Sequence, residues 1–495
     1  MTAPTSGSGT ASGPGSGTGP GSGADLHLDL PAEGARRTAL AQALRSAVRS
    51  GRLAGGTRLP PYRALAADLG LARNAVADAY AELVAEGWFT ARQGSGTRVA
   101  EGVAAAAAPS AGAGPAPERP RHDLLQGKPD PASFPRGPWA TSARRALAGA
   151  PTEAFGPGDP RGRPELRRAL AGYLSRTRGV RTGPENIVVC SGFANGLRLL
   201  ASLRPRDWAV EAYGLPFHHG ILDAAGIRPH PVAVDEDGAR TGEVPARART
   251  LLLTPAHQFP TGCALLPARR AAAVEWARST GGLIVEDDYD GEFRYDRKPV
   301  DPTPWQLGER RNSRQRLPVG ALQALDPDRV IYLGTASKSL APGLRLGWMV
   351  VPPGLMEEVT AAKGFGDWAS STLDQLTLAE FIRSGAYDRH VRKMRLQYQR
   401  RRNDLVARLA ADAPHLRVSG VAAGLHIVLE LPPGTEPDVI RSAARQGLAL
   451  HGLSYFRHPD AVGPHADGLV VGYGTPTDSL WSGALDALMR ALPAP

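Results

Sequence analysis

Three short apolar runs, each followed by a polar segment, constrain the fold of this chain more than any other feature. Helical patterns alternate with such runs from about residue 121 onward, which predicts an α/β domain. In open α/β sheets, ligands bind beyond the carboxyl ends of the strands, so we expect the polar segments to converge on one edge. The runs are 250–253, 282–285 and 330–333, and the polar segments after them are 254–262, 286–290 and 334–338.

The polar segments contain the groups that pyridoxal phosphate (PLP) requires. Its aldehyde forms a Schiff base with a lysine amine, for which Lys338 is the candidate. Its ring nitrogen stays protonated beside a carboxylate, and Asp287 is the expected partner. The phenol of Tyr289 is placed to hydrogen-bond the ring hydroxyl. Lysine supplies only five of the 58 basic residues, so a retained lysine is itself informative.

The phosphate of the same cofactor needs backbone amides, hydroxyls and an arginine. A Ser-Gly-Phe segment precedes a helical pattern and is predicted to present its amides, and other hydroxyl and arginine side chains flank Lys338 in sequence. His257 is a further expected cofactor contact. The predicted phosphate ligands are Ser191, Gly192, Phe193, Thr335, Ser337 and Arg345.

Each of these features has a simpler interpretation when taken alone. A single lysine is usually a solvated charge, and the acidic run 286–288 would also suit a solvated turn or a weak divalent-metal site. The roles arrive together and at strand ends, which favours the cofactor, and no metal site is predicted.

Residues 24–100 form a separate patterned block, with three helical apolar faces and a hairpin. The second face ends at Gly70, and only Gly70 and Leu71 are expected to separate it from the third, which is typical of a helix-turn-helix. A tight turn at 93–96 then joins two short strands into a wing. The block contains ten arginines and seven acidic residues, and it has no lysine.

The placement of these arginines favours binding to double-stranded DNA. Arg63 opens the second helix, while Arg73 and Asn74 open the third, where base edges would lie in the major groove. A protein-docking module with scattered arginines is the alternative.

The rest of the chain sets the domain organisation. Residues 1–23 are Gly/Ser-rich and predicted to be a disordered tail, 101–120 are an Ala/Pro/Gly-rich linker, and 121–495 form the large domain. Two cysteines, the lack of a long apolar run and the lack of a signal peptide predict a cytoplasmic protein without a membrane segment.

The first block resembles the GntR-type winged helix in four stretches: 56–60, 63–66, 73–76 and 94–97. The family usually has hydroxyl residues where this chain has Tyr62, Ala72 and Ala75. The resemblance implies DNA contacts by Arg58, Arg63, Arg73, Asn74, Ser95, Gly96 and Thr97.

The large domain resembles fold type I aminotransferases, and the whole chain is similar to the MocR/GabR family. The fold class expected is an N-terminal winged helix-turn-helix (α+β) followed by a large α/β domain of the fold type I, PLP-dependent transferase class. The resemblance implies a cytoplasmic transcription regulator that forms a head-to-tail homodimer, binds a DNA operator, and senses PLP or a PLP-reactive amine. The stretches that carry it are 155–162, 254–262, 286–295 and 337–347.

Departures from the family pattern leave two roles open. Leu215 stands where a ring-stacking tyrosine is usual, so Tyr213, Phe217 or His257 is expected to replace it. Aminotransferases hold the substrate carboxylate with an arginine, but the matching stretch 467–473 has none. Arg457 is a candidate for this role, and a surface arginine is the alternative interpretation.

The missing arginine favours a sensor over an enzyme, because it removes much of the energy that positions a substrate. An active aminotransferase with an appended winged helix is one alternative, and a large domain that serves only as a dimerisation scaffold is the other. Residues 300–317 look inserted and are predicted to form an exposed loop.

Overall fold

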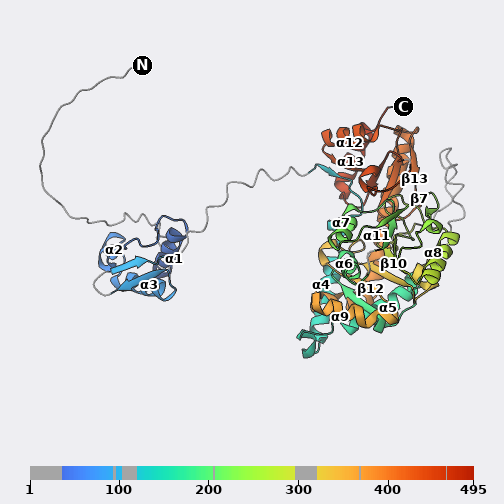
Figure 1. Cartoon of the computed structure of the whole chain (residues 1–495). Coiled ribbons are helices and arrows are strands. Elements are labelled where there is room, and N and C mark those ends of the chain that lie inside the picture. The colour runs from blue at the N-terminus through green and yellow to red at the C-terminus, as the bar shows by residue number, and fades with distance from the viewer. Residues whose placement is uncertain are drawn as a thin grey trace, which may run out of the picture. The chain divides into compact units, whose positions relative to one another are not determined.

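The computed structural model describes residues 36–92, 96–102, 120–204, 207–295, 320–366, 370–463 and 465–494. The predicted tail, most of the predicted linker, Ser95 and the inserted segment 300–317 lie outside the described residues. The chain divides into two compact units, Met1–Glu118 and Arg119–Pro495 (Figure 1).

The small unit has three helices and a two-stranded antiparallel hairpin, as the sequence predicts. Leu44 and Leu83 from two of the helices pack with Phe89 of the hairpin in one buried core. The phenol of Tyr80 donates to the carbonyl oxygen of Pro60, 3.0 Å away. The elements are α1 (Arg36–Arg49), α2 (Tyr62–Asp68), α3 (Arg73–Ala85), β1 (Phe89–Arg92) and β2 (Gly96–Val99).

The turn between α2 and α3 is longer than the two residues expected. Helix α2 ends at Asp68, so four residues, Leu69 to Ala72, separate it from α3. Gly70 has a φ of +61°, a left-handed conformation that glycine adopts easily and that stops the helix earlier than the apolar pattern suggests.

The large unit is built on a seven-stranded sheet of order β4-β12-β11-β10-β9-β5-β6, in which only β12 runs antiparallel to its neighbours. The three apolar runs of the sequence become the adjacent parallel strands β9, β10 and β11. The strands are β4 (Ile187–Cys190), β5 (Trp208–Glu211), β6 (His230–Val232), β9 (Thr250–Leu253), β10 (Leu283–Asp288), β11 (Val330–Thr335) and β12 (Gly347–Val350).

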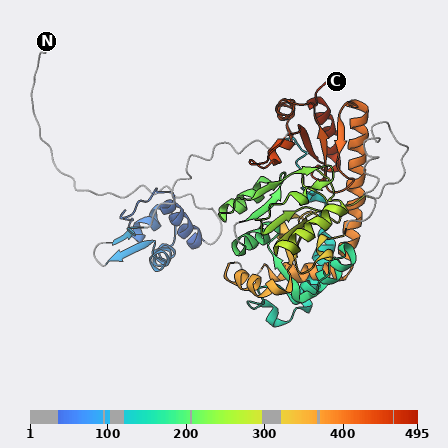
Figure 2. The ribbon, with the colours of Figure 1, turned by 45° about the vertical axis from the view of Figure 1, so that its right-hand side comes forward.

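Helices cover both faces of this sheet (Figure 2). Consecutive residues of β10 show this, because Ile284 packs in one apolar cluster and Val285 in another. The helices are α4 (Arg136–Gly149), α5 (Pro164–Arg178), α6 (Phe193–Leu203), α7 (Pro216–Ala224), α8 (Pro267–Thr280), α9 (Met356–Gly366), α10 (Thr372–Arg383) and α11 (Ala386–Asp412).

The C-terminal part of the large unit forms its own layer, at the end marked by α12 and α13 in Figure 1. A four-stranded antiparallel sheet of order β13-β14-β17-β16 packs there with these helices. No helix in the described part of the chain has the length and hydropathy to cross a membrane. The elements are β13 (Arg417–Ser419), β14 (His426–Glu430), β16 (His451–Gly452), β17 (Gly468–Gly472), α12 (Glu436–Arg445) and α13 (Asp478–Ala491).

Two short strand pairings complete the fold. The segment at the start of the large unit pairs with a strand after α12, and a small hairpin follows β6. These strands are β3 (His122–Asp123), β15 (Leu448–Ala449), β7 (Val234–Asp235) and β8 (Gly238–Ala239).

Candidate cofactor site and nucleic-acid interface

The carboxyl ends of β9, β10 and β11 lie side by side, which brings their polar segments together. In the register of β10 and β11, Asp287 is paired with Leu333 and Asp288 with Gly334. Gly334 stands four residues before Lys338 in the sequence. The acid and the lysine therefore belong to one edge of the sheet, as the strand-end argument predicts.

Lys338 is held by a segment that the sequence reasoning did not single out. Its Nζ donates to the carbonyl oxygen of Gly127 at 2.7 Å, and Gly127 precedes the first helix of the large unit. Burial lowers the pKa of Lys338, and the charge of Asp287 partly opposes this shift. A lysine with a lowered pKa has a larger neutral fraction, which is the form that attacks a carbonyl carbon.

Asp287 is a buried carboxyl group that lacks a partner for one oxygen. Its Oδ1 is buried and has no hydrogen-bond partner among the residues that the structure describes. Burial, and then the charge of Asp288, raise its pKa well above the usual range, while Lys338 acts in the opposite direction. A buried carboxylate of this kind is costly unless a cation or a donor meets it. A protonated ring nitrogen would be that donor, so the residues present fit PLP.

Tyr289 and His257 form a hydrogen-bonded group with Asp290, which the sequence reasoning did not assign to the site. The Nδ1 of His257 lies 2.8 Å from Oδ2 of Asp290 and 3.0 Å from the phenol oxygen of Tyr289. Burial raises the pKa of Tyr289 well above its usual range, which keeps the phenol protonated as a donor. His257 is therefore fixed by hydrogen bonds near the phenol, and its buried Nε2 has no partner in the described part of the chain.

The guanidinium of Arg345 lies beside the start of α6. Gly192 caps the helix with a φ of +87° and offers no side-chain cap to the first helical amides. The Nη2 of Arg345 donates to the carbonyl oxygen of Ser191 at 2.5 Å, and a Cβ built on Gly192 would lie 3.1 Å from this guanidinium. Among the described residues, Arg345 alone combines a side chain with a positive φ, at 52°. Helix amides, a glycine and an arginine at one place suit a phosphate.

Hydroxyl groups surround this helix end and the lysine. The hydroxyl of Ser191 lies 3.1 Å from that of Ser370, a second residue that sequence reasoning missed. Thr335 donates from Oγ1 to Oγ of Ser337 at 2.9 Å, and it accepts from the backbone amide of Ser337 at 3.2 Å. Both residues are buried beside Lys338 in sequence.

The aromatic ring beside the start of α6 is a histidine that was not anticipated. The rings of Phe193 and His218 lie 4.6 Å apart, and burial lowers the pKa of His218 to about 3, so this ring is neutral. Phe217, one of the expected stacking residues, is 60% exposed. Tyr213 packs at the edge of an apolar cluster instead.

That cluster includes a residue of the stretch 467–473, for which the resemblance to aminotransferases predicts a carboxylate-binding arginine. Val470, in the stretch that lacks an arginine, packs with Phe259, Phe456 and Tyr289. The guanidinium of Arg457 donates from Nη2 to the carbonyl oxygens of Ala461 and Gly463, each at 2.8 Å. Arg457 is therefore engaged by its own loop, and the wall facing Tyr289 is apolar.

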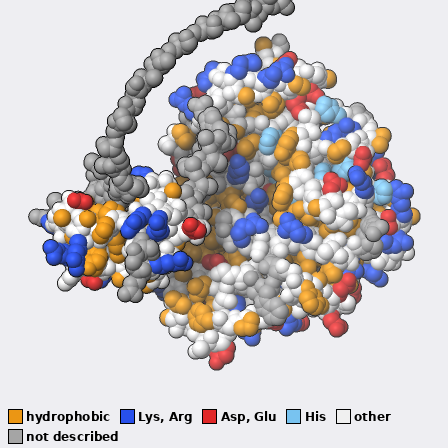
Figure 3. Space-filling view, turned by 60° about the vertical axis from the view of Figure 1, so that its left-hand side comes forward, with side chains coloured by type: hydrophobic (Ala, Val, Ile, Leu, Met, Phe, Trp, Pro, Cys, Tyr) orange, Lys and Arg blue, Asp and Glu red, His pale blue; other side chains and the backbone are white. Residues whose placement is uncertain are grey.

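The predicted DNA contacts of the small unit lie on its surface. Arg58, Arg63, Arg73, Asn74 and Gly96 are exposed and Thr97 is half-buried, while Ser95 lies outside the described residues. Arg73 is the first residue of α3, where the helix end points its amides outward. Basic side chains form patches on the visible face of this unit (Figure 3).

The hairpin is extended by a third short segment that brings Arg58 to the wing. The backbones of Arg58 and Arg98 form an antiparallel β-bridge, and the amide of Leu59 donates to the carbonyl oxygen of Thr97 at 2.9 Å. A Cβ on Gly96 would lie 3.4 Å from Nε of Arg58, so the side chain of this arginine lies beside the strand pair next to the wing turn.

Comparisons with known protein families agree with both units. Residues 36–99 match the bacterial regulatory proteins of the gntR family, and residues 132–462 match aminotransferase class I and II. Among solved structures, a kynurenine aminotransferase from Pyrococcus horikoshii covers 74% of this chain and 90% of its own, with a TM-score of 0.64 at 23% identity.

Two relatives that align with most of this chain are named as regulators. The probable rhizopine catabolism regulatory protein MocR of Rhizobium meliloti is 32% identical, over 90% of this chain and 92% of its own. The pyridoxine biosynthesis transcriptional regulator PdxR of Corynebacterium glutamicum is 31% identical, over 88% and 92%. The winged helix, the aminotransferase-like fold and these relatives show that the chain belongs to the MocR-type helix-turn-helix transcriptional regulators, in which a GntR-type domain precedes an aminotransferase class I and II domain.

Proposed function

We propose that this regulator binds PLP in its large domain and that the bound cofactor, or an amine reacting with it, changes the affinity of the winged helix for an operator. The observation that carries the proposal is the unpartnered, buried Oδ1 of Asp287 on the same sheet edge as Lys338. Burying an acid without a donor and a lysine with a lowered pKa lowers the stability of the fold. A cofactor bound between these two residues would explain why the protein keeps them.

Each residue of the site then has a distinct task. When bound, PLP supplies an aldehyde that reacts with amines and a ring that withdraws electrons. Lys338 provides the amine that attaches the cofactor, and Asp287 holds a proton at the ring nitrogen. Tyr289 donates from its phenol, kept in place by His257. The start of α6 and Arg345 hold the phosphate, with Ser191, Thr335 and Ser337 as hydroxyl donors.

The apolar wall formed by Phe259, Phe456 and Val470 supports sensing over sustained transamination. An amino-acid substrate would bring a carboxylate to this apolar wall, and burying that charge unpaired would be costly. We infer that the effector is PLP itself or an amine without a carboxylate beside the amino group.

The proposal includes a domain organisation, a compartment and an oligomeric state. The winged helix spans 24–100, the linker 101–120 and the large domain 121–495, and the regulator acts in the cytoplasm as a head-to-tail homodimer. Two winged helices in a dimer would engage two half-sites of the operator together.

The visible absorption spectrum of the purified full-length protein tests this function. We expect a cofactor band that is absent from a Lys338→Ala variant, and that changes when a simple alkylamine is added but not when an amino acid is added at the same concentration. A band that responds equally to both, with turnover in a coupled assay, would favour the aminotransferase alternative. If the protein shows no band after incubation with PLP, the large domain would be interpreted as a dimerisation scaffold.

A further inference from the structure

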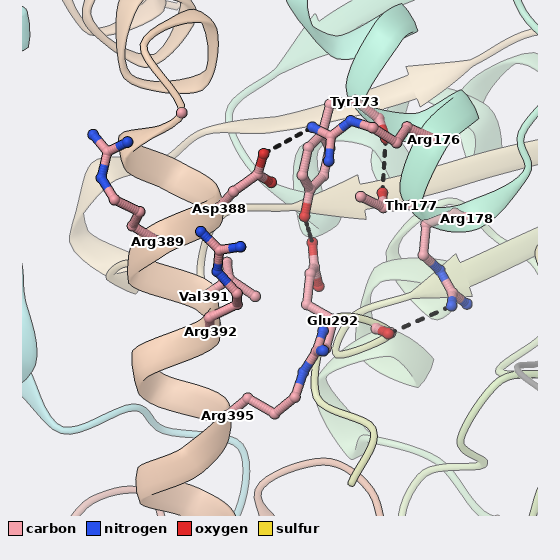
Figure 4. Close-up of a pocket in the computed structure, with 12 residues that line it drawn as sticks. Tyr173, Arg176, Thr177, Arg178, Glu292, Asp388, Arg389, Val391, Arg392 and Arg395 are labelled. Carbon is pink, nitrogen blue, oxygen red and sulfur yellow. Dashed lines mark hydrogen bonds and ion pairs between the residues drawn. The ribbon is translucent and has the colours of Figure 1, made fainter. Parts of the chain in front are cut away.

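A second hollow, apart from the cofactor site, lies between the end of α5 and the first turns of α11. It has a volume of about 350 Å³, and residues 291 and 292, which follow β10, form part of its wall. Five arginines line it, two from α5 and three from α11, and Figure 4 shows Arg395 extending from α11 toward Glu292. The five are Arg176, Arg178, Arg389, Arg392 and Arg395.

The acids around this hollow do not balance its positive charge. Arg176 pairs with Asp388 at 2.9 Å, and Arg178 pairs with Asp288 at 2.6 Å beneath the hollow. Glu292 is the other lining acid, but burial raises its pKa to about 7, so it is only partly charged at neutral pH. The lining therefore has a net positive charge.

Two of the arginines on α11 lack acidic partners. Among the residues that the structure describes, Arg392 forms no hydrogen bond or ion pair, and Arg389 donates only to the carbonyl oxygen of Ser384. Arg389, Arg392 and Arg395 lie three residues apart on one helix face, where like charges repel. A bound anion would remove this repulsion and accept hydrogen bonds from several guanidinium groups at once.

Both walls of the hollow contact the neighbours of the cofactor residues. On α11, the phenol of Tyr387 lies 2.6 Å from the hydroxyl of Ser339, and Nε2 of His390 lies 2.8 Å from the Ser339 carbonyl oxygen. Ser339 directly follows Lys338. On α5, Arg178 donates to both carboxylate oxygens of Asp288, the residue after Asp287.

We propose that this hollow is a second ligand site, which takes a small phosphate-type anion such as a phosphorylated metabolite and transmits its occupancy to Lys338 through α11 and Ser339. Binding of the anion is independent of the proposed function, whereas the effect on Lys338 rests on it. A small ligand fits better than duplex DNA because the side chain of Arg178, at the base of the hollow, is only 6% exposed.

Calorimetric titration of the full-length, PLP-loaded protein with inorganic pyrophosphate tests the site. At constant ionic strength we expect saturable binding of one pyrophosphate per chain, weakened about tenfold or more in Arg392→Ala and in Arg389→Ala. Arg400→Ala removes an exposed charge from the same helix outside the hollow, and it should bind as the parent does. A second readout is the cofactor absorption band, which should shift with pyrophosphate in the parent but not in Arg392→Ala.

Three results of the pyrophosphate titration by itself would overturn the proposal. They are absence of saturable binding, equal binding by the parent and Arg392→Ala, and loss of binding in Arg345→Ala alone, which would assign the pyrophosphate to the cofactor site. Reduced operator affinity of Arg392→Ala with unchanged pyrophosphate binding would also overturn it, and would assign the surface to DNA. If PLP does not bind at all but the Arg392-dependent titration holds, only the proposed function fails.

Discussion

The imidazole of His257 and the carboxylate of Asp290 lie 2.8 Å apart, and both side chains are buried at the carboxyl edge of the sheet. This contact joins the segment after β9 to the segment after β10. It also distinguishes two acids that look alike in the sequence. Asp290 has a partner inside the protein, while Oδ1 of Asp287 has none within the described ranges.

The difference between these two acids gives the first prediction. Asp287→Asn should weaken PLP binding about tenfold or more, because an adjacent carboxylate stabilises a protonated ring nitrogen by one or more pKa units. Asp290→Asn keeps a hydrogen-bond acceptor for His257 and should cost less. Titration of both variants with PLP, followed by absorbance, measures this. Equal losses would show that Asp287 has no special role.

The second prediction concerns the attachment of the cofactor to Lys338. Borohydride reduction of the PLP-loaded protein should label one peptide, and this label should disappear in Lys338→Ala. The exposed Lys393 on α11 is the matched control, and Lys393→Ala should be labelled as the parent is. A label on the peptides of Lys298 or Lys363 would refute the assignment.

The third prediction follows from Glu211, whose carboxylate accepts hydrogen bonds from Thr254 and Gln258. Burial raises its pKa from 4.5 to about 7. The folded state therefore holds this proton more tightly, so the stabilisation is complete below pH 4.5 and is lost as the pH rises through 7, by up to about 3 kcal/mol.

Replacement of this acid should flatten the pH dependence. Between pH 5 and 8, the unfolding midpoint of the large domain should fall less in Glu211→Gln than in the parent. Glu286 and Glu292 also have pKa values raised to about 7, so part of the fall should remain. The exposed Glu275→Gln serves as control, and an identical fall in all three proteins would contradict the argument.

Local patterns predict the strands, the small-unit helices and the sheet edge that gathers Asp287 and Lys338, because apolar periodicity and strand-end chemistry are visible in short windows. Contacts between distant segments are not visible there. Gly127 reaches Lys338 across 211 residues, and Arg178 reaches Asp288 across 110. His218 belongs to no motif in its own segment, and its ring contact with Phe193 arises only when α7 packs beside α6. The earlier end of α2 reflects the backbone conformation of Gly70, which an apolar pattern does not report.

The fourth prediction separates base contacts from phosphate contacts in the winged helix. Arg73→Ala should cost about 1–3 kcal/mol and relax sequence preference, since its place at the start of α3 suits a base edge. Arg58→Ala, beside Gly96 at the wing turn, should weaken binding to all sequences alike and reduce the salt dependence by about one phosphate contact. Mobility-shift titrations at several salt concentrations measure both. Unchanged affinity of Arg73→Ala would remove it from the interface.

The last prediction concerns the link between the two domains. A ligand shifts an equilibrium only if it binds two states with different affinity. The composition of residues 101–120 predicts a flexible connection, which by itself can transmit little. Coupling should therefore act through the dimer, by changing the spacing of two winged helices that must engage half-sites about one helical turn, or a multiple of it, apart. We expect PLP to change operator affinity by about 5–150-fold, and Lys338→Ala to reduce this response.

Operator titrations of apo and PLP-loaded protein at one salt concentration measure the effect. Lengthening the linker with Gly and Ser should preserve it if coupling acts through the dimer, and abolish it if the tether carries the signal. Identical apo and loaded curves would mean that PLP alone is not the effector, and the same titration with an alkylamine added to the loaded protein would then decide between an amine sensor and a scaffold.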